Sequence, residues 1–231
     1  MIAIDGPAAS GKSSTAQWVA ERLGYRHVDS GSLYRAATAA QLRHKALAAT
    51  WTEQDVLDAA QSVSLEAAAT SFVPRIAGRP ADDDIRGPEV TKHVSQVARM
   101  PAVRSWVNAL VRRAAAAHDV VVDGRDMGTV VFPDADLKVF LVADPWERAR
   151  RRLMQLLQRR PTDEEIAEET DRIVQRDGRD ATQTVQAADA VLIDTTYLTQ
   201  QEQVDRIVAL AKAVTQRETA TSLLDDAHRS E

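Results

Sequence analysis

Short apolar segments alternate with longer, more polar ones along this chain. Five apolar runs have the length of β-strands, and the segments between them have the residue patterns of helices. The predicted strands cover residues 1–5, 25–29, 119–123, 137–144 and 190–194. Because buried parallel strands are apolar throughout and are joined by helices, this alternation predicts an α/β fold with a five-stranded parallel sheet covered by helices on both faces.

Capping residues mark where several of the predicted helices begin. Thr52 precedes Asp55 by three residues, and Thr162 and Thr199 each precede a Glu by the same spacing, which is the pattern of a capping box. The helices are expected at residues 12–23, 30–43, 88–99, 102–117 and 145–158, and from residues 52, 162 and 199 onward. The sequence after about residue 216 is polar, and we expect 216–231 to be a frayed, disordered tail.

Residues 63–87 interrupt this order. Residues 63–78 contain β-branched and alternating stretches without a helical period, and the turn-rich sequence GRPADDD follows them. We expect a small insertion with antiparallel pairing at this place. No internal repeat or low-complexity linker divides the chain further.

Composition and charge exclude several classes of protein. The chain has 231 residues, of which 44% are hydrophobic, and 29 basic residues against 34 acidic ones give a net charge of -5. A dedicated partner of nucleic acid or of anionic membranes usually carries a basic excess, so neither partner is expected. The absence of cysteine rules out disulfides and thiolate zinc sites. No apolar run approaches the roughly 20 residues of a membrane helix, and no basic leader precedes the first strand, so we expect a soluble cytoplasmic protein.

The stretch after the first strand fits the phosphate-binding pattern G-x-x-x-x-G-K-[ST]. Its residues are Gly6, Pro7, Ala8, Ala9, Ser10, Gly11, Lys12 and Ser13, and Ser14 follows them. The glycines let backbone N–H groups approach an anion, and the helix that starts near Lys12 directs its positive end to the same place. Lys12 would reach the β- and γ-phosphates, and the Ser13 hydroxyl would bind Mg²⁺. The loop therefore predicts ATP with Mg²⁺ as cofactor.

A phosphate loop alone fits switches, motors and kinases equally well. A GTP switch usually reads guanine with Asn-Lys-x-Asp, which is absent, and the DIRG sequence at 84–87 lies in the irregular insertion, where we interpret it as structural. A motor ATPase generally needs a longer chain. An ATP-binding module that gates a partner without phosphoryl transfer stays open at this point.

Arginines distinguish a kinase for a phosphorylated acceptor, because two anions must be brought together against their repulsion. Arg35 follows the second predicted strand, and Arg125 follows the third, where strand ends converge on the loop. Four more arginines open one helix at 148, 150, 151 and 152, and Arg176 and Arg179 lie in QRDGRD. A solvated helix face explains the 148–152 group about as well as catalysis does, and Tyr34 fits either a half-buried core position or a substrate pocket.

The motifs together resemble bacterial cytidylate kinases over residues 2 to about 212. The resemblance is carried by IDGPAASGKSS, VDSGSLYRAA, DIRGPEVTKHVSQVARMPAVR, VVDGRDMGTVVFPDADLKVFLVADPWERARRR and QRDGRDATQTVQAADAVLIDTTYLT. It implies a P-loop kinase with core strand order 2-3-1-4-5 that moves the γ-phosphate of ATP to CMP or dCMP. It also implies a core of residues 1–62 and 99–215, an acceptor-binding insertion at 63–98 and a short lid at about 151–180.

The resemblance also implies roles for individual residues. It assigns reading of the cytosine edge to Ser95, Arg104 and Asp126, and binding of the acceptor phosphate to Arg35 and Arg125. The remaining assignments are pocket lining for Ser30 and Tyr34, sugar contacts for Arg176 and Asp180, and cover of the transferring phosphoryl group for Arg148 and Arg152. The mechanism that follows is direct in-line transfer without a phosphoenzyme, in which Lys12, Arg125, Arg148 and Arg152 stabilise charge.

One position departs from the family pattern. The family usually has another phosphate-binding arginine three residues after the sugar-contacting aspartate, whereas this chain has Gln183. Glutamine supplies neither the charge nor the guanidinium fork, so Arg35 and Arg125 suffice, Arg179 compensates, or the acceptor binds more weakly. A kinase for UMP, AMP or another small metabolite is the alternative within enzymes. No sequence feature indicates a partner protein, and a monomer is the default.

Overall fold

The central element is a parallel sheet of five strands in the order β2-β6-β1-β7-β8. The computed structural model describes residues 1–44 and 50–228, with side chains up to residue 216. The strands are β1 (Ile2–Asp5), β2 (Arg26–Asp29), β6 (Val120–Asp123), β7 (Leu137–Val142) and β8 (Val191–Asp194). Counted among themselves, these strands have the order 2-3-1-4-5, so the predicted strands and their order are confirmed.

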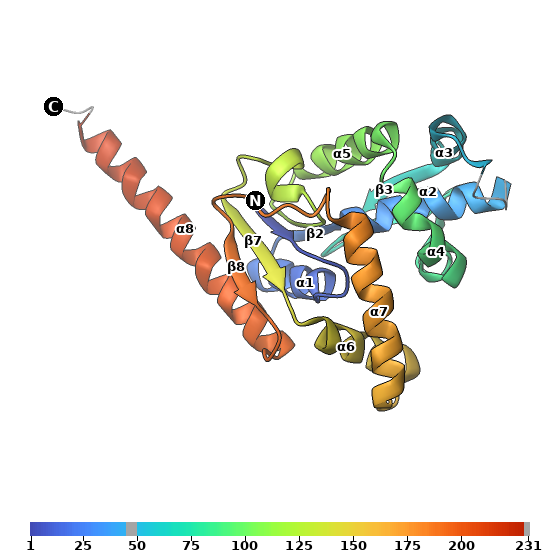
Figure 1. Cartoon of the computed structure of the whole chain (residues 1–231). Coiled ribbons are helices and arrows are strands. Elements are labelled where there is room, and N and C mark those ends of the chain that lie inside the picture. The colour runs from blue at the N-terminus through green and yellow to red at the C-terminus, as the bar shows by residue number, and fades with distance from the viewer. Residues whose placement is uncertain (45–49, 229–231) are drawn as a thin grey trace.

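Helices cover both faces of this sheet (Figure 1). They are α1 (Lys12–Leu23), α2 (Ser30–His44), α3 (Glu53–Ala60), α4 (Pro88–Val97), α5 (Pro101–Ala115), α6 (Pro145–Leu157), α7 (Asp163–Asp180) and α8 (Gln200–His228). A π-helix, Met127–Val131, follows β6. The capping boxes predicted at Thr52 and Thr162 are present, and Thr199 exchanges the same pair of hydrogen bonds with Glu202.

The alternation of side chains along β1 divides the core into two layers. Ile2 and Ile4 are buried with Val19 of α1 and Ile207 of α8 on one face. Ala3 belongs to the larger cluster on the other face, which α2, α4 and α5 supply. Because successive strand residues point to opposite faces, one apolar strand can be covered on both sides, as its continuous apolar sequence requires.

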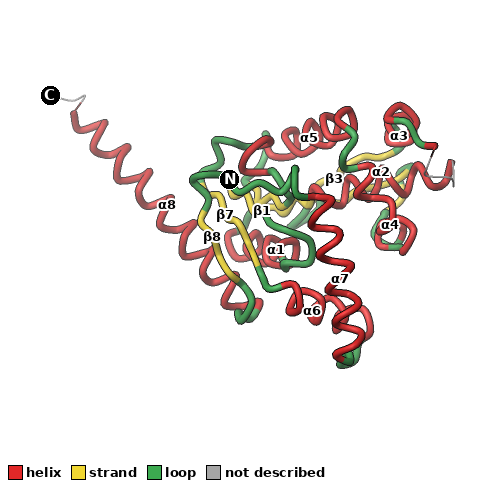
Figure 2. The backbone as a smooth tube through the Cα atoms, in the orientation of Figure 1, coloured by secondary structure: helices red, strands yellow, loops and turns green. Residues whose placement is uncertain are grey.

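The irregular segment forms a separate antiparallel sheet, as predicted. Its strands are β3 (Val63–Ala67), β4 (Phe72–Ile76) and β5 (Arg79–Pro80), followed by a 3₁₀ turn, Asp84–Arg86, and α4. Figure 2 shows this sheet at the end of the molecule opposite α8. It contacts the main sheet at the outer strand β2, where the His27 N–H donates to the Thr70 carbonyl oxygen at 3.0 Å.

The predicted end of the last helix is wrong. We expected a disordered tail after about residue 216, whereas α8 continues to His228 and projects beyond the sheet (Figure 1). Residues 200–228 contain neither glycine nor proline, so nothing in the local sequence stops the helix after its contacts with the body end. Residues 229–231 of the expected tail lie outside the described residues. Within the described residues, no helix is long and apolar enough to cross a membrane.

Candidate active site

The phosphate loop connects β1 to α1 in a conformation that two glycines permit. Gly6 has a φ of 146°, and a Cβ there would lie 2.1 Å from the Leu141 carbonyl oxygen. Gly11 precedes α1 with a φ of 88°. It forms no side-chain capping hydrogen bond, so it leaves the first N–H groups of the helix uncapped. The loop therefore offers the backbone donors and the positive helix end that an anion needs.

Lys12 lies buried beneath this loop. Its Nζ donates a hydrogen bond to the Pro7 carbonyl oxygen at 2.7 Å. Burial lowers the pKa of Lys12 from 10.5 to about 7, and the charges of Arg125 and Arg176 lower it too, while Asp123 and Asp5 act in the opposite direction. A phosphate placed at the loop would supply the counter-charge that this ammonium group lacks.

Two aspartates end adjacent strands next to the loop. Asp5 of β1 accepts hydrogen bonds from the N–H groups of Met127 and Gly128 at 2.9 and 2.7 Å, which fixes the start of the π-helix. Burial raises the pKa of Asp5 to about 6 in spite of these bonds. Asp123 of β6 accepts a hydrogen bond from the Ser13 hydroxyl at 2.7 Å.

The same Ser13 hydroxyl is suited to bind a metal ion. A hydroxyl that donates its proton to Asp123 keeps its lone pairs for a cation, and Mg²⁺ prefers oxygen ligands. In the described part of the chain, no group of three or more His, Asp or Glu side chains could hold a metal by itself. A Mg²⁺ at Ser13 would therefore take further ligands from the phosphates of a nucleotide and from water.

A cluster of three arginines, Arg35, Arg125 and Arg176, lies beside the phosphate loop. Arg125 donates to the Gly6 carbonyl oxygen at 3.2 Å and lies 3.7 Å from the Asp180 carboxylate. Arg176 lies 3.6 Å from the same carboxylate, and burial followed by the charges of Arg125 and Arg35 lowers its pKa to about 10. The buried Nε atoms of Arg125 and Arg176 have no hydrogen-bond partner among the described residues. These cations repel one another, and an anion between them would relieve that repulsion.

Arg35 approaches this cluster from α2. It donates to the Ile85 carbonyl oxygen and to the Thr91 hydroxyl, both at 3.1 Å, so it also holds the segment that enters α4. Burial lowers the pKa of Arg35, and the charges of Arg152 and Arg125 add to this effect. The insertion and the arginine cluster therefore share one side chain.

A second group of polar side chains comes from α2, α4, α5 and the start of the π-helix. Arg104 forms an ion pair with the buried Asp126. The buried Tyr34 hydroxyl has no hydrogen-bond partner among the described residues, and burial raises its pKa to about 12. Ser95 of α4 is buried as well. An arginine, a carboxylate and hydroxyls supply both donors and acceptors for the edge of a base.

Ser30 occupies a more structural position than the sequence suggests. Its hydroxyl donates to the Asp123 carbonyl oxygen at 2.8 Å, and the residue is 2% exposed. A Cβ at the neighbouring Gly124 would lie 2.6 Å from this hydroxyl. Ser30 therefore packs the start of α2 against the end of β6.

The arginines of α6 divide into two sets. Arg148 is buried, donates to the Ala8 carbonyl oxygen at 2.8 Å and pairs with Asp177 of α7 at 2.7 Å, so it fastens the loop to the pair of helices α6 and α7. Arg152 pairs with Glu169 at 3.0 Å. Arg150 instead pairs with Glu147 of its own helix.

Two other arginines point away from the cluster. Arg151 donates to the Thr195 and Thr196 carbonyl oxygens, which gives it a structural role at the end of β8. Arg179 is exposed, and among the described residues it donates to the Gln175 carbonyl oxygen of its own helix. Compensation for Gln183 by Arg179 therefore requires its side chain to leave this position.

Sequence reasoning missed four residues of this site. They are Asp5, His27, Asp123 and Asp177, and each contacts a predicted site residue or the segment beside it. The position of Asp5 and Asp123 at the carboxyl ends of parallel strands was a usable signal, because those ends meet at the site. Asp177 lacked such a signal, since its partner Arg148 lies on another helix.

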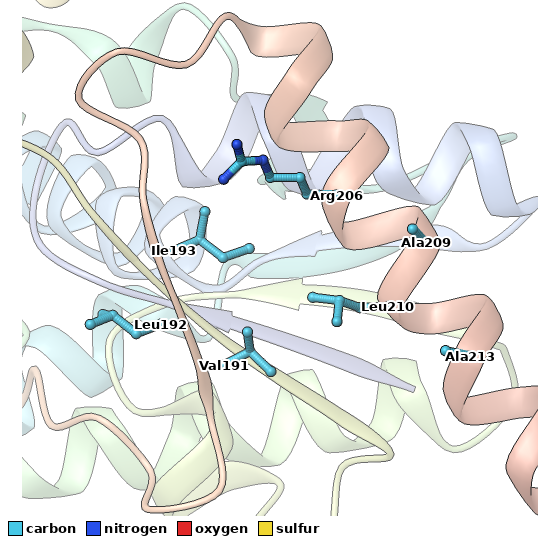
Figure 3. Close-up of a pocket in the computed structure, with 7 residues that line it drawn as sticks. All are labelled: Val191, Leu192, Ile193, Arg206, Ala209, Leu210 and Ala213. Carbon is cyan, nitrogen blue, oxygen red and sulfur yellow. The ribbon is translucent and has the colours of Figure 1, made fainter.

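A separate apolar groove of about 470 Å³ lies between β8 and α8 (Figure 3). Residues 191–193 form one wall, and Arg206, Ala209, Leu210 and Ala213 form the other. None of these residues is a candidate site residue, so this groove is separate from the phosphate loop and its arginine cluster.

Comparison with known proteins adds a family to this geometry. The family model described as cytidylate kinase matches residues 2–213. A cytidylate kinase of Desulfitobacterium hafniense (strain Y51) is 44% identical over 214 residues, which cover 90% of this chain and 91% of the relative. One of Lactiplantibacillus plantarum is 37% identical over 238 residues, with 95% and 96% covered. Among solved structures, a gluconokinase from Sinorhizobium meliloti 1021 is 15% identical, with a TM-score of 0.48 and 95% of each chain covered.

Proposed function

The chain belongs to the cytidylate kinase family, and from this membership we propose that it transfers the γ-phosphoryl group of ATP to CMP and dCMP, giving ADP with CDP or dCDP. The observation that carries the proposal is the set of half-buried cations Arg35, Arg125 and Arg176 beside the phosphate loop, where the Nε atoms of Arg125 and Arg176 have no hydrogen-bond partner among the described residues. An ATP-binding module needs no second anion site, whereas a kinase for a phosphorylated acceptor does.

The donor binds at the loop in this proposal. The N–H groups of residues 9–13 and Lys12 hold the β- and γ-phosphates, and Arg148 keeps the loop attached to α6. Ser13 would hold Mg²⁺, which when bound supplies positive charge to the β- and γ-phosphate oxygens. Lys12 reaches the donor after it leaves its hydrogen bond with the Pro7 carbonyl oxygen.

The acceptor binds across the crevice. Its phosphate is held by Arg35 and Arg125. The cytosine edge is read by Ser95, Arg104 and Asp126, which together supply hydrogen-bond donors and acceptors. Arg176 and Asp180 contact the sugar. Tyr34 and Ser30 line and support this pocket, and the unpartnered Tyr34 hydroxyl is free to hydrogen-bond the acceptor.

The acceptor phosphate attacks in line and needs no strong general base, because it is already an anion. Lys12, Arg125, Arg148 and Arg152 stabilise charge as the bond to the leaving ADP breaks. The insertion, 63–98, and the lid at about 151–180 close over the two nucleotides and exclude water, which suppresses hydrolysis of ATP.

A coupled assay of ADP release with CMP, dCMP, UMP and AMP in parallel tests the proposal. We expect turnover with CMP and dCMP that Lys12→Ala abolishes. Turnover with UMP or AMP but not CMP would make the chain a kinase for another nucleotide. ATP binding without saturable binding of cytosine nucleotides at millimolar concentration would make it an ATP-binding module. We further propose a cytoplasmic monomer, which size-exclusion chromatography with light scattering tests for its oligomeric part.

A further inference from the structure

His27, Asp123 and Ser13 form a continuous chain of hydrogen bonds behind the phosphate loop. The Nε2 atom of His27 lies 2.7 Å from one carboxylate oxygen of Asp123, and the Ser13 hydroxyl donates to the other at 2.7 Å. His27 comes from β2, Asp123 from β6 and Ser13 from α1, so the fold brings the three together from separate elements. Nothing in the transfer mechanism above uses His27.

The charge of Asp123 sets the direction of these hydrogen bonds. His27 is 7% exposed and Asp123 is 2% exposed, so water cannot replace either partner. Burial acts to raise the pKa of Asp123, but the hydrogen bond and charge of His27, the charge of Lys12 and the hydrogen bond of Ser13 together keep it below its ordinary value. An ionised carboxylate only accepts hydrogen bonds, and therefore His27 donates its Nε2–H and Ser13 donates its hydroxyl proton.

This arrangement sets the direction in which the Ser13 lone pairs point. Because the hydroxyl proton is directed at Asp123, the oxygen lone pairs point away from that carboxylate and stay available to a cation. If Asp123 lost its fixed orientation, the hydroxyl could rotate and present its proton to the cation. The residue that fixes the other carboxylate oxygen of Asp123 therefore controls how Ser13 meets a cation.

We propose that His27 is a positioning residue for the donor site: it holds Asp123 so that Ser13 presents its lone pairs to the Mg²⁺ that accompanies the nucleotide. This inference rests on the donor site of the proposed function. It also connects that site to the acceptor insertion, because the backbone N–H of His27 is bonded to the Thr70 carbonyl oxygen at the tip between β3 and β4.

The competing explanation is that His27 merely fastens β2 to β6. Other charges face the imidazole too, namely Asp29 at the end of β2 and Glu21 on α1, and both raise its pKa in addition to Asp123. A purely structural pair would change the stability of the protein without changing how much Mg²⁺ strengthens nucleotide binding. The two explanations therefore differ in a measurable quantity.

That quantity is the ratio of two dissociation constants for AMP-PNP, a non-hydrolysable ATP analogue, measured by calorimetry in EDTA and in saturating Mg²⁺. We expect His27→Leu to reduce this ratio about tenfold, the usual effect of removing a partner behind a metal ligand. His27→Gln keeps an N–H donor near the same place and should restore most of the ratio. His118→Leu is the matched control, because His118 is exposed and contacts Arg26 and Phe72.

A double-mutant cycle tests whether His27 acts through Ser13. In a Ser13→Ala background, His27→Leu should cause no further change in the ratio. An equal tenfold loss in both backgrounds would overturn the proposal, and so would an unchanged ratio for His27→Leu with Ser13 intact. Failure of the wild type to bind AMP-PNP would count against the donor site itself rather than against His27.

A measurement on the wild type covers the case in which His27→Leu does not fold. The chain has 5 histidines, so ¹⁵N-labelling of histidine gives a small set of imidazole signals. Adding Mg²⁺ to the AMP-PNP complex should shift the Nε2 resonance of His27 and leave that of His118 in place. An unshifted His27 resonance would overturn the proposal without any substitution.

Discussion

Arg125 donates a hydrogen bond to the carbonyl oxygen of Gly6 at 3.2 Å, across 119 positions of sequence. The bond joins the end of β6 to the first residue of the phosphate loop, because β1 and β6 are adjacent in the sheet. A single guanidinium thereby lies next to both proposed phosphate sites. The side chain at this position must therefore be both positively charged and long enough to reach both sites.

Arg125→Ala should lower kcat/KM for CMP about 100-fold or more, because it removes a fixed cation from the transferring group. Arg125→Lys should recover only part of this loss, since an ammonium group lacks the guanidinium fork. Steady-state ADP release measures both variants. Arg179→Ala is the control and should stay near wild type, because Arg179 is exposed and bonded within α7. An equal loss for Arg179→Ala would show that Arg179 compensates for Gln183.

Binding of ADP at pH 8 should be accompanied by uptake of up to about one proton. The pKa of Lys12 is lowered to about 7 by burial and neighbouring arginines, so most of the group is neutral at pH 8 until phosphates restore a counter-charge. Calorimetry in two buffers of different ionisation enthalpy measures the uptake. Lys12→Arg should abolish it, because arginine stays protonated. The same uptake in that variant would assign the proton to another group.

Asp5 should make the free energy of unfolding depend on pH. Its pKa rises from 3.8 in the unfolded chain to about 6 in the folded one, so ionisation opposes folding. The cost is absent below the unfolded pKa, grows as the pH rises through 4 to 6 and amounts to about 3 kcal/mol at pH 7. Because about 0.5 kcal/mol of this cost is already present at pH 4, the stability of Asp5→Asn relative to wild type should increase by about 2.5 kcal/mol between pH 4 and pH 7 in urea unfolding. A difference that stays constant with pH would contradict this account.

Gly6→Ala should destabilise the protein by at least about 2 kcal/mol and weaken ATP binding, because its Cβ would overlap the Leu141 carbonyl oxygen at a strained φ of 146°. Gly178→Ala is the matched change in a helix. A Cβ at Gly178 meets nothing within 4 Å, so this variant should gain about 0.5–1 kcal/mol from helix propensity. Urea unfolding of the two variants compares them directly, and a similar effect at both sites would refute the close approach at Gly6.

Local signals predicted much of the fold. The apolar runs gave the five strands, the capping boxes at Thr52 and Thr162 marked helix starts, and the glycine pattern located the phosphate loop. Each of these features depends on residues within a few positions of one another. The end of α8 was predicted wrongly because the polar composition after residue 216 was given more weight than the absence of a residue that stops a helix.

The sequence by itself determined the strands, their helices, the phosphate loop and the resemblance that identified Arg35, Arg125 and Arg176 as candidates. Only the tertiary structure decided which side chains meet: Arg148 with Asp177, and His27 with Asp123 and through it with Ser13. Strand formation is decided by neighbours in sequence, whereas these contacts depend on strand order and on which face each side chain occupies. Their partners lie tens of residues apart, where no spacing rule connects them.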